Sequence, residues 1–272
     1  MEVWRLLDTG LADGYRNMAV DEAVLVACSG GVVPPTVRFY RWQPPGLSLG
    51  YFQRTDQGLD LGACQRLGVD VVRRPTGGRA VLHDDEVTYS VVAPFGARFP
   101  EGEVRENFAI VTGCLVKGLE ALGLQASLLA PQRIKGSEFA PGRQSACFLT
   151  YAGYEVMVAG RKLVGSAQRA FERAFLQHGA ILLGFDAEKH RAILRGQAPR
   201  EEGIRYFTDR ITCLREQLSY PVGPGELINA MCEGFEKALG VRLEPGALTA
   251  QEESLARDLR GKYASRAWTF RR

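Results

Sequence analysis

The sequence predicts an α+β fold in which mixed, mainly antiparallel sheets are flanked by helices. Runs of β-branched and aromatic residues, typical of strands, alternate along the chain with apolar residues at helical spacing. No internal repeat occurs, and no Ser- or Gly-rich stretch has the composition of a linker. We therefore expect residues 1–272 to form a single domain, with C-terminal helices of about residues 224–272 packed on it.

The N-terminal part of the chain is expected to form a strand at residues 3–7 and a helix at residues 17–28. Residues 37–42 and 46–51 follow, and both are strand-like. Two prolines lie between these two runs. The pattern predicts that the runs pair as a hairpin.

Two further strand-like runs, residues 69–72 and 87–92, flank a polar loop and should belong to one sheet. An amphipathic helix is expected over residues 108–122, because its apolar residues recur at helical spacing, and Gly123 should end it. The remaining elements are a buried strand at residues 179–183 and helices at residues 227–239 and 255–268.

The loop between residues 72 and 90 carries an unusual density of hydrogen-bond donors. Gly77 and Gly78 have no Cβ, so a ligand can lie directly on the backbone there, although many glycine pairs only make a tight connection. Arg73, Arg74, Arg79 and His83 surround the pair. Such a set of donors indicates recognition of an oxygen-rich group.

The run RRPTGGRAVLHDDEVTYS, which ends at Ser90, resembles the signature of the biotin/lipoate protein ligase and octanoyltransferase superfamily. Members of this superfamily handle lipoyl or octanoyl groups destined for a lysine on a carrier domain. The resemblance implies a catalytic domain of the biotin/lipoate protein ligase type. It also implies substrate-binding roles for Arg74, Thr76, Gly77, Gly78, Arg79, Ala80 and His83.

A second segment forms a predicted hairpin, with strands at residues 154–158 and 161–169 and a Gly-containing turn between them. Lys162 lies just past its tip, where a lysine is ordinarily solvated. The run GRKLVGSAQR resembles the lysine motif of the same superfamily, and the resemblance gives Lys162 the reactive role. The small residues Gly165, Ser166 and Ala167 would let an acyl chain pass close to the backbone.

Cys147 differs from the other five cysteines, which lie in or beside helix-like apolar segments. It follows the polar loop of residues 131–145, and catalytic residues concentrate at such junctions, although an inert thiol at a strand start is the alternative. The run SACF resembles the nucleophile segment of the Bacillus-type octanoyltransferases. In that branch the cysteine carries the acyl group as a thioester, and the hairpin lysine lowers its pKa.

The three histidines are expected to differ in their roles. His83 ends the signature loop, where the family's motif also carries histidine, and we expect it to orient substrate or loop. His178 either lines the site or is a hydrogen-bonded core residue, and His190 should lie on a solvated helix face. Asp84, Asp85 and Glu86 should form a solvated turn rather than act as general acids or metal ligands.

The composition is that of an ordinary globular protein, with 46% hydrophobic and 24% charged residues. No segment approaches the roughly 20 apolar residues of a membrane span, and the N-terminus lacks a secretory apolar region. Six cysteines without a CxxC pair indicate reduced thiols, a cytoplasmic location and no metal site. A net charge of +3 is too small to imply nucleic acid, but it suits an encounter with an acidic carrier protein.

The resemblance implies an octanoyltransferase that works without a cofactor in lipoate biosynthesis. The donor would be octanoyl-acyl carrier protein, and the acceptor a lysine of a lipoyl-domain protein such as glycine cleavage protein H. Three alternatives stay open: an ATP- and Mg-dependent ligase, an amidotransferase between carrier domains, and a silent module that binds acyl carriers. Many lipoate ligases carry an additional C-terminal adenylation domain, and no room for one is seen beyond Trp268.

Overall fold

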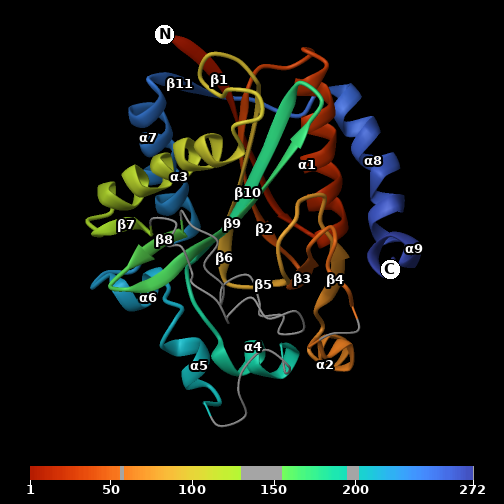
Figure 1. Ribbon diagram of the computed structural model, residues 1–272, viewed down its shortest axis with the longest axis vertical. Coiled ribbons are helices and arrows are strands. Elements are labelled where there is room, and N and C mark those ends of the chain that lie inside the picture. Colours follow the sequence, from red (N-terminus) through yellow and green to blue (C-terminus); the bar gives the residue numbers. More distant parts are fainter. Residues whose placement is uncertain (56–57, 130–154, 195–201, 272) are drawn as a thin grey trace.

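The computed structural model describes residues 1–55, 58–129, 155–194 and 202–271 (Figure 1). Its centre is an eight-stranded mixed sheet. In spatial order the strands are β11 (Val241–Pro245), β1 (Glu2–Ala12), β2 (Thr36–Trp42), β6 (Glu86–Pro94), β10 (Ala174–Leu182), β9 (Arg161–Phe171), β8 (Glu155–Val158) and β7 (Ala126–Leu129). β1 pairs in parallel with β11 and with β2, and every other pair in this sheet is antiparallel. The predicted fold class is therefore confirmed.

A second sheet of three strands stands beside the first. In it β3 (Gly46–Leu49) pairs in parallel with β4 (Asp70–Arg73) and antiparallel with β5 (Val81–His83). The predicted hairpin of β2 and β3 is therefore wrong. The reason is that both edges of β2 are already hydrogen-bonded, to β1 and to β6, so that β3 has no free edge of β2 to join.

The expectation that residues 69–72 and 87–92 share one sheet is also wrong. The first run forms β4 in the small sheet, and the second lies in β6 of the large sheet. The short strand β5 separates them and pairs with β3, so the chain leaves the small sheet before β6 begins. The signature loop, residues 74–80, connects β4 to β5 within the small sheet, and Thr76 in this loop contacts His178 on β10 of the large sheet.

Four long helices cover the two faces of the large sheet (Figure 1). On one face α3 (Val104–Ala121) packs on α7 (Pro224–Leu239), and on the other α1 (Gly14–Ser29) packs on α8 (Ala250–Ala264). The shorter helices are α2 (Leu61–Arg66), α4 (Ala187–Ile193), α5 (Arg205–Thr208), α6 (Leu214–Gln217) and α9 (Arg266–Thr269). None of the helices in the described part of the chain is long and apolar enough to span a membrane.

The alternation of side chains along the strands divides the core into two layers. Phe39 and Tyr40 are neighbours on β2, yet Phe39 packs in the layer beneath α3 and α7, and Tyr40 in the layer beneath α1 and α8. Both side chains are at most 1% exposed. Because both faces of the sheet are covered, the side chains of its central strands are buried on both sides.

Candidate functional site

A pocket opens where the small sheet meets the large one, with about 320 Å³ of empty space that is partly open to solvent. The residues that line it lie on α1, on the six strands β2, β3, β5, β6, β9 and β10, and, for Arg74, directly after β4. Its lining consists of Met18, Tyr40, Trp42, Ser48, Arg74, Val81, His83, Thr88, Gly165, Ser166, Ala167, His178, Gly179 and Ala180. Most of the exposed surface of this pocket is apolar.

Small residues on two paired strands form one wall of the pocket. Gly165 and Ser166 on β9 pair with Ala180 and Gly179 on β10. A Cβ at position 179 would lie 2.5 Å from the carbonyl oxygen of Gly165, and 2.8 Å from the Tyr89 ring. The wall therefore has little room for side chains, and it leaves backbone and small groups to face a ligand.

The buried side chain of Arg74 binds the backbone of the signature loop. Its Nη2 donates to the carbonyl oxygens of Gly77 (2.6 Å) and Arg79 (2.8 Å), and its Nη1 donates to Ser48 O (3.0 Å). The side chain lines the pocket although Arg74 is only 3% exposed. Because a guanidinium offers donors in a fixed plane, these bonds fix the path of residues 77–79.

Arg73, in contrast, is a structural residue. Its Nη1 donates to the carbonyl oxygens of Gly50 and Gln53, and its Nε donates to Thr269 O. Burial lowers the pKa of its guanidinium. These bonds tie the C-terminal segment to the loop after β3, so the donors of Arg73 serve the backbone rather than a ligand.

His83 stacks on Trp42 with ring centroids 4.0 Å apart and an interplanar angle of 8°. Its Nε2 lies 2.7 Å from Ser48 Oγ, and its Nδ1 lies 2.6 Å from Glu86 Oε1. Thr88 Oγ1 also donates to this carboxylate. The imidazole is thereby held in the pocket wall.

The acidic run after His83 is only partly a solvated turn. Asp84 and Asp85 are partly exposed and pair with Lys189 and Arg215. Glu86 is 2% exposed, so its placement in a solvated turn was wrong. The cause is the hydrogen bonding just described, which gives the buried carboxylate two donors.

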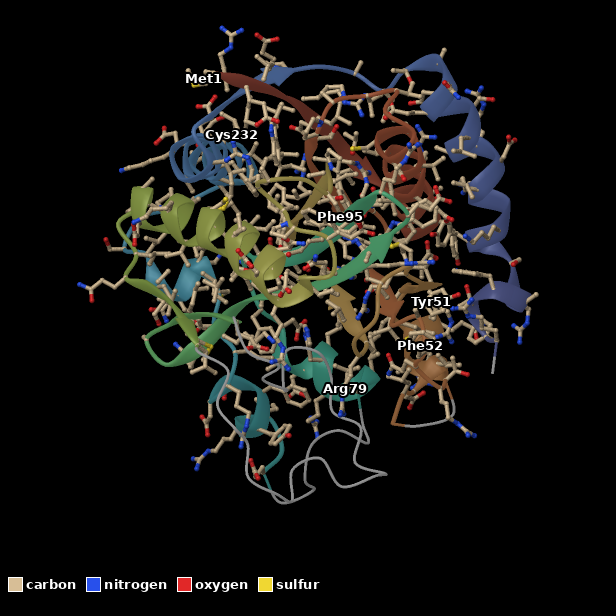
Figure 2. The ribbon with its side chains drawn as sticks, turned by 45° about the horizontal axis from the view of Figure 1, so that its top comes forward. Met1, Tyr51, Phe52, Arg79, Phe95 and Cys232 are labelled. Carbon is tan, nitrogen blue, oxygen red and sulfur yellow. The ribbon has the colours of Figure 1, made fainter. Side chains whose placement is uncertain are left out.

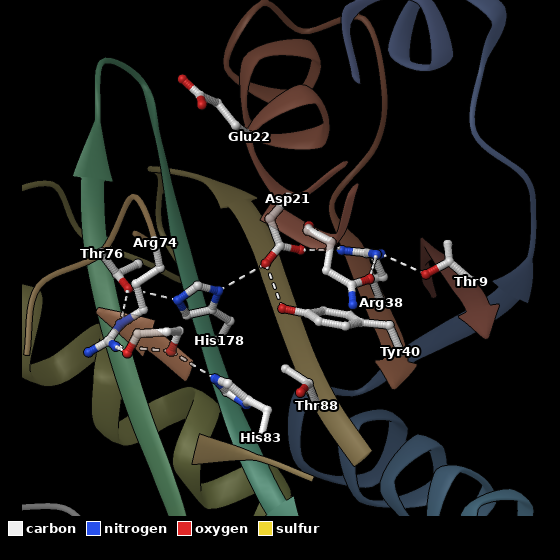
Figure 3. Close-up of polar contacts among 12 residues, drawn as sticks. Thr9, Asp21, Glu22, Arg38, Tyr40, Arg74, Thr76, His83, Thr88 and His178 are labelled. Atoms are coloured by element: carbon white, nitrogen blue, oxygen red, sulfur yellow. Dashed lines mark hydrogen bonds and ion pairs between the residues drawn. The ribbon is translucent and has the colours of Figure 1, made fainter. Parts of the chain in front are cut away.

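His178 lies between Asp21 and Thr76 (Figure 3). Its Nδ1 is 2.9 Å from Asp21 Oδ2, and its Nε2 is 2.7 Å from Thr76 Oγ1. Burial lowers the pKa of His178. Burial is also the largest influence on the Asp21 carboxyl and opposes its ionisation, but Arg38 at 2.6 Å and the bond to His178 outweigh it and hold the pKa of Asp21 below its ordinary value.

Lys162 is buried, at 2% exposure, although it lies beside the Ala159–Gly160 turn. Its Nζ is 3.6 Å from Glu155 Oε1 on the adjacent strand. Its backbone N–H donates to Arg210 O, and its carbonyl accepts from Thr212 N. The lysine is therefore fixed at both its backbone and its charged end, unlike an ordinary solvated hairpin lysine.

The pocket brings together five of the residues predicted for the site: Arg74, His83, Gly165, Ser166 and Ala167. Thr76 and Ala80 are buried beside it, and Gly77, Gly78 and Arg79 form the outer part of the loop. Lys162 lies three residues before Gly165 on β9 and does not line this pocket. Cys147 lies outside the described residues.

Sequence reasoning missed the contributions of Asp21, Tyr40 and Trp42. Asp21 is fully buried on α1, and Tyr40 donates to its carboxylate at 2.9 Å. The available signal was that Asp21 shares a helix face with the apolar residues Met18, Val24 and Leu25, because a buried charge requires partners. His190 was also misjudged: it is 5% exposed and packs on Phe185, with burial lowering its pKa to about 4.

An aromatic and cationic patch lies on the surface beside the loop. It consists of Tyr51, Phe52, Arg169 and Arg271; Phe52 is 87% exposed and meets Tyr51 edge-on (Figure 2). The guanidinium of Arg271 lies 3.7 Å above the Tyr51 ring, and that of Arg169 lies 5.1 Å from it. Tyr51 N donates to Thr76 O, so the patch is joined directly to the signature loop.

The family model of the lipoyl protein ligase A/B catalytic domain matches residues 13–236. The chain therefore belongs to this family. Among similar proteins, the octanoyltransferase LipM of Kyrpidia tusciae is 46% identical over the full length of both chains. Those of Geobacillus kaustophilus and Bacillus subtilis are 40% and 38% identical, and each match covers all of this chain and 99% of the relative.

Solved structures of the same family share the fold. A lipoate-protein ligase A bound with ATP is 26% identical with a TM-score of 0.79, and the match covers 99% of each chain. The bipartite lipoate protein ligase of Thermoplasma acidophilum is 26% identical with a TM-score of 0.80, over 99% of this chain and 97% of that one. The predicted type of catalytic domain is thus confirmed.

Proposed function

We propose that this protein is an octanoyltransferase of lipoate biosynthesis. It would move an octanoyl group from acyl carrier protein to a lysine of a lipoyl-domain protein, such as glycine cleavage protein H. The observation that carries this proposal is the full-length similarity, at 38–46% identity, to octanoyltransferases of three bacteria. The pocket supports it, because a wall of small residues suits an unbranched alkyl chain, which needs apolar surface and little width.

The transfer would proceed in two steps through Cys147. Its thiolate attacks the carbonyl carbon of the donor thioester, and the carrier thiol leaves with the electron pair of the broken C–S bond. The neutral acceptor amine then attacks the new thioester. An amide forms, the Cys147 thiolate is released, and the amine loses a proton.

Lys162 is the proposed partner of Cys147 in both steps. A fixed ammonium group favours the thiolate that attacks the donor, and the same amine could relay the proton lost by the acceptor. Its burial and its position 3.6 Å from Glu155 support this role, because the side chain is held in place before substrate arrives. Glu155 is the first described residue after the segment that contains Cys147.

The surface patch is the proposed docking site for the two carriers. Guanidinium groups attract acidic surfaces, and an exposed phenylalanine gives an apolar anchor. Since Tyr51 is bonded to Thr76, a carrier bound there would lie next to the loop that borders the pocket.

An ATP-dependent ligase is the second candidate, because one similar structure is a ligase with bound ATP. The experiment that separates the two is octanoyl transfer from acyl carrier protein to H protein in ATP-free buffer, read by mass spectrometry of the acceptor. We expect transfer without ATP and no gain on adding ATP and Mg. Modification of the acceptor that requires free octanoate, ATP and Mg would instead establish the ligase. Transfer from an octanoylated carrier lysine alone would establish an amidotransferase.

A further inference from the structure

Two similar chains of hydrogen bonds converge on Arg74. In one, Arg74 Nε donates to Thr76 Oγ1 (3.2 Å), which contacts His178, and His178 contacts Asp21. In the other, Arg74 Nη1 donates to Ser48 Oγ (3.2 Å), which contacts His83, and His83 contacts Glu86. Each chain of hydrogen bonds therefore runs from the guanidinium through a hydroxyl and an imidazole to a buried carboxylate. Figure 3 shows the one that passes through Thr76 and His178 to Asp21.

The chain through His178 has a defined direction. A guanidinium only donates, so Thr76 Oγ1 accepts from Arg74 and has its own hydrogen left to give. The carboxylate of Asp21 already accepts from Arg38 and Tyr40, and it accepts the proton of His178 Nδ1 as well. With that proton on Nδ1 and burial lowering the pKa of the ring, Nε2 is left as the acceptor for the Thr76 hydroxyl.

Arg74, at the end of this chain of hydrogen bonds, acts on the signature loop. Arg74 binds the carbonyl oxygens of Gly77 and Arg79. In a trans peptide the following N–H points opposite to the carbonyl, so the amides of Gly78 and Ala80 point away from the guanidinium. The orientation of Arg74 therefore decides which way the peptide groups of this loop face.

We propose that His178 is a positioning residue: as the neutral, Nδ1-protonated tautomer it accepts the Thr76 hydroxyl hydrogen, and Thr76 thereby holds Arg74 against the loop carbonyls. His178 lines the pocket, but its role requires no proton transfer to substrate. Asp21 serves by fixing the tautomer. Tests of this role by octanoyl transfer rest on the proposed function, whereas an NMR test of the His178 tautomer does not.

The first test removes the link at Thr76. Thr76→Val deletes the hydroxyl with little change in shape, and Thr76→Ser restores it. A matched control is Thr36→Val, because Thr36 Oγ1 is equally buried, accepts from Arg5 Nε at 3.1 Å and donates to Pro34 O at 3.0 Å. We expect similar losses of Tm in both valine variants, but a fall in octanoyl transfer of about tenfold only in Thr76→Val, with Thr76→Ser retaining most of the rate. Parental activity in Thr76→Val, or an equal loss in Thr36→Val, would overturn the positioning role.

The second test reads the tautomer directly. Long-range ¹H–¹⁵N NMR spectra show which ring nitrogen carries the proton, and with three histidines in the chain each can be assigned from its own substitution. At pH 7.5 the wild-type His178 should show a protonated Nδ1 and a bare Nε2. An Nε2-protonated ring or an imidazolium would overturn the proposal. If the wild type transferred no acyl group, the proposed function would be refuted, but the NMR result would still decide whether His178 is the Nδ1-protonated tautomer.

Discussion

Gly50 lies so close to the backbone of Gly78 that no larger residue fits at position 50 unless Gly78 moves. A Cβ built on Gly50 would lie 1.9 Å from the carbonyl oxygen of Gly78, and Gly78 itself has φ +87°. The signature loop is thus packed on the end of the small sheet as well as bonded to Arg74.

Gly50→Ala should therefore impair the site without changing any residue of the loop. Overpacking of this kind costs about 1–3 kcal/mol, and here the loop is the part that must shift. We expect octanoyl transfer to fall by roughly an order of magnitude or more. Gly113→Ala on α3 is the control, since nothing lies within 4 Å of its added Cβ. That variant should keep its activity and gain a little stability, measured by urea unfolding.

Lys162→Ala should raise the pKa at which Cys147 is alkylated by iodoacetamide, because the ammonium group proposed to favour its thiolate is lost. A rise of about one to two pH units is expected for one charge at close range. The five described cysteines should not obscure the measurement, because burial raises the pKa of each thiol. Lys189→Ala, which breaks the Asp84 ion pair, is the matched control. An unchanged alkylation profile in Lys162→Ala would rule out the cysteine–lysine pair and point back to a ligase.

Phe52→Ala should raise the KM for the carrier protein severalfold and leave the fold intact. The ring is 87% exposed, so its removal costs little stability, whereas truncating an aromatic anchor of an interface costs about 1 kcal/mol or more, which is a fivefold or greater loss of affinity. Val32→Ala, at a residue that is 56% exposed, controls for loss of an exposed apolar group. Equal KM values for Phe52→Ala and wild type would remove the patch from the docking site.

Folding stability should decline as the pH falls from about 6.5 toward 4, in part through His190. Burial lowers the pKa of His190 from its ordinary 6.5 to about 4, so in this range the unfolded chain binds a proton that the native protein does not. The loss amounts to ~3 kcal/mol at most. His190→Asn keeps a donor for Asp186 O and does not titrate. Urea unfolding at pH 7.5 and 5.0 should show a smaller decline for this variant; equal declines would mean that His190 ionises normally in the native state.

The sequence could locate the parts of the site but not their assembly. The signature loop, the hairpin of β8 and β9, and the small residues from Gly165 to Ala167 were predictable, since each rests on a local pattern. The pairing of β2 and β3 was mispredicted because local patterns do not reveal which strand edges are already occupied. The contact of His178 with Asp21 joins residues 157 positions apart, and only the tertiary fold brings them together.

The measurement closest to the central claim is the mass of the intact protein after incubation with octanoyl-acyl carrier protein in the absence of ATP. We expect a gain of one octanoyl group that hydroxylamine removes. The gain should be absent from Cys147→Ala and retained by Cys232→Ala, whose thiol is the least buried of the described cysteines. If Cys147→Ala transferred octanoyl to the acceptor lysine at the parental rate and the wild type carried no thioester adduct, the proposed role of Cys147 would be contradicted.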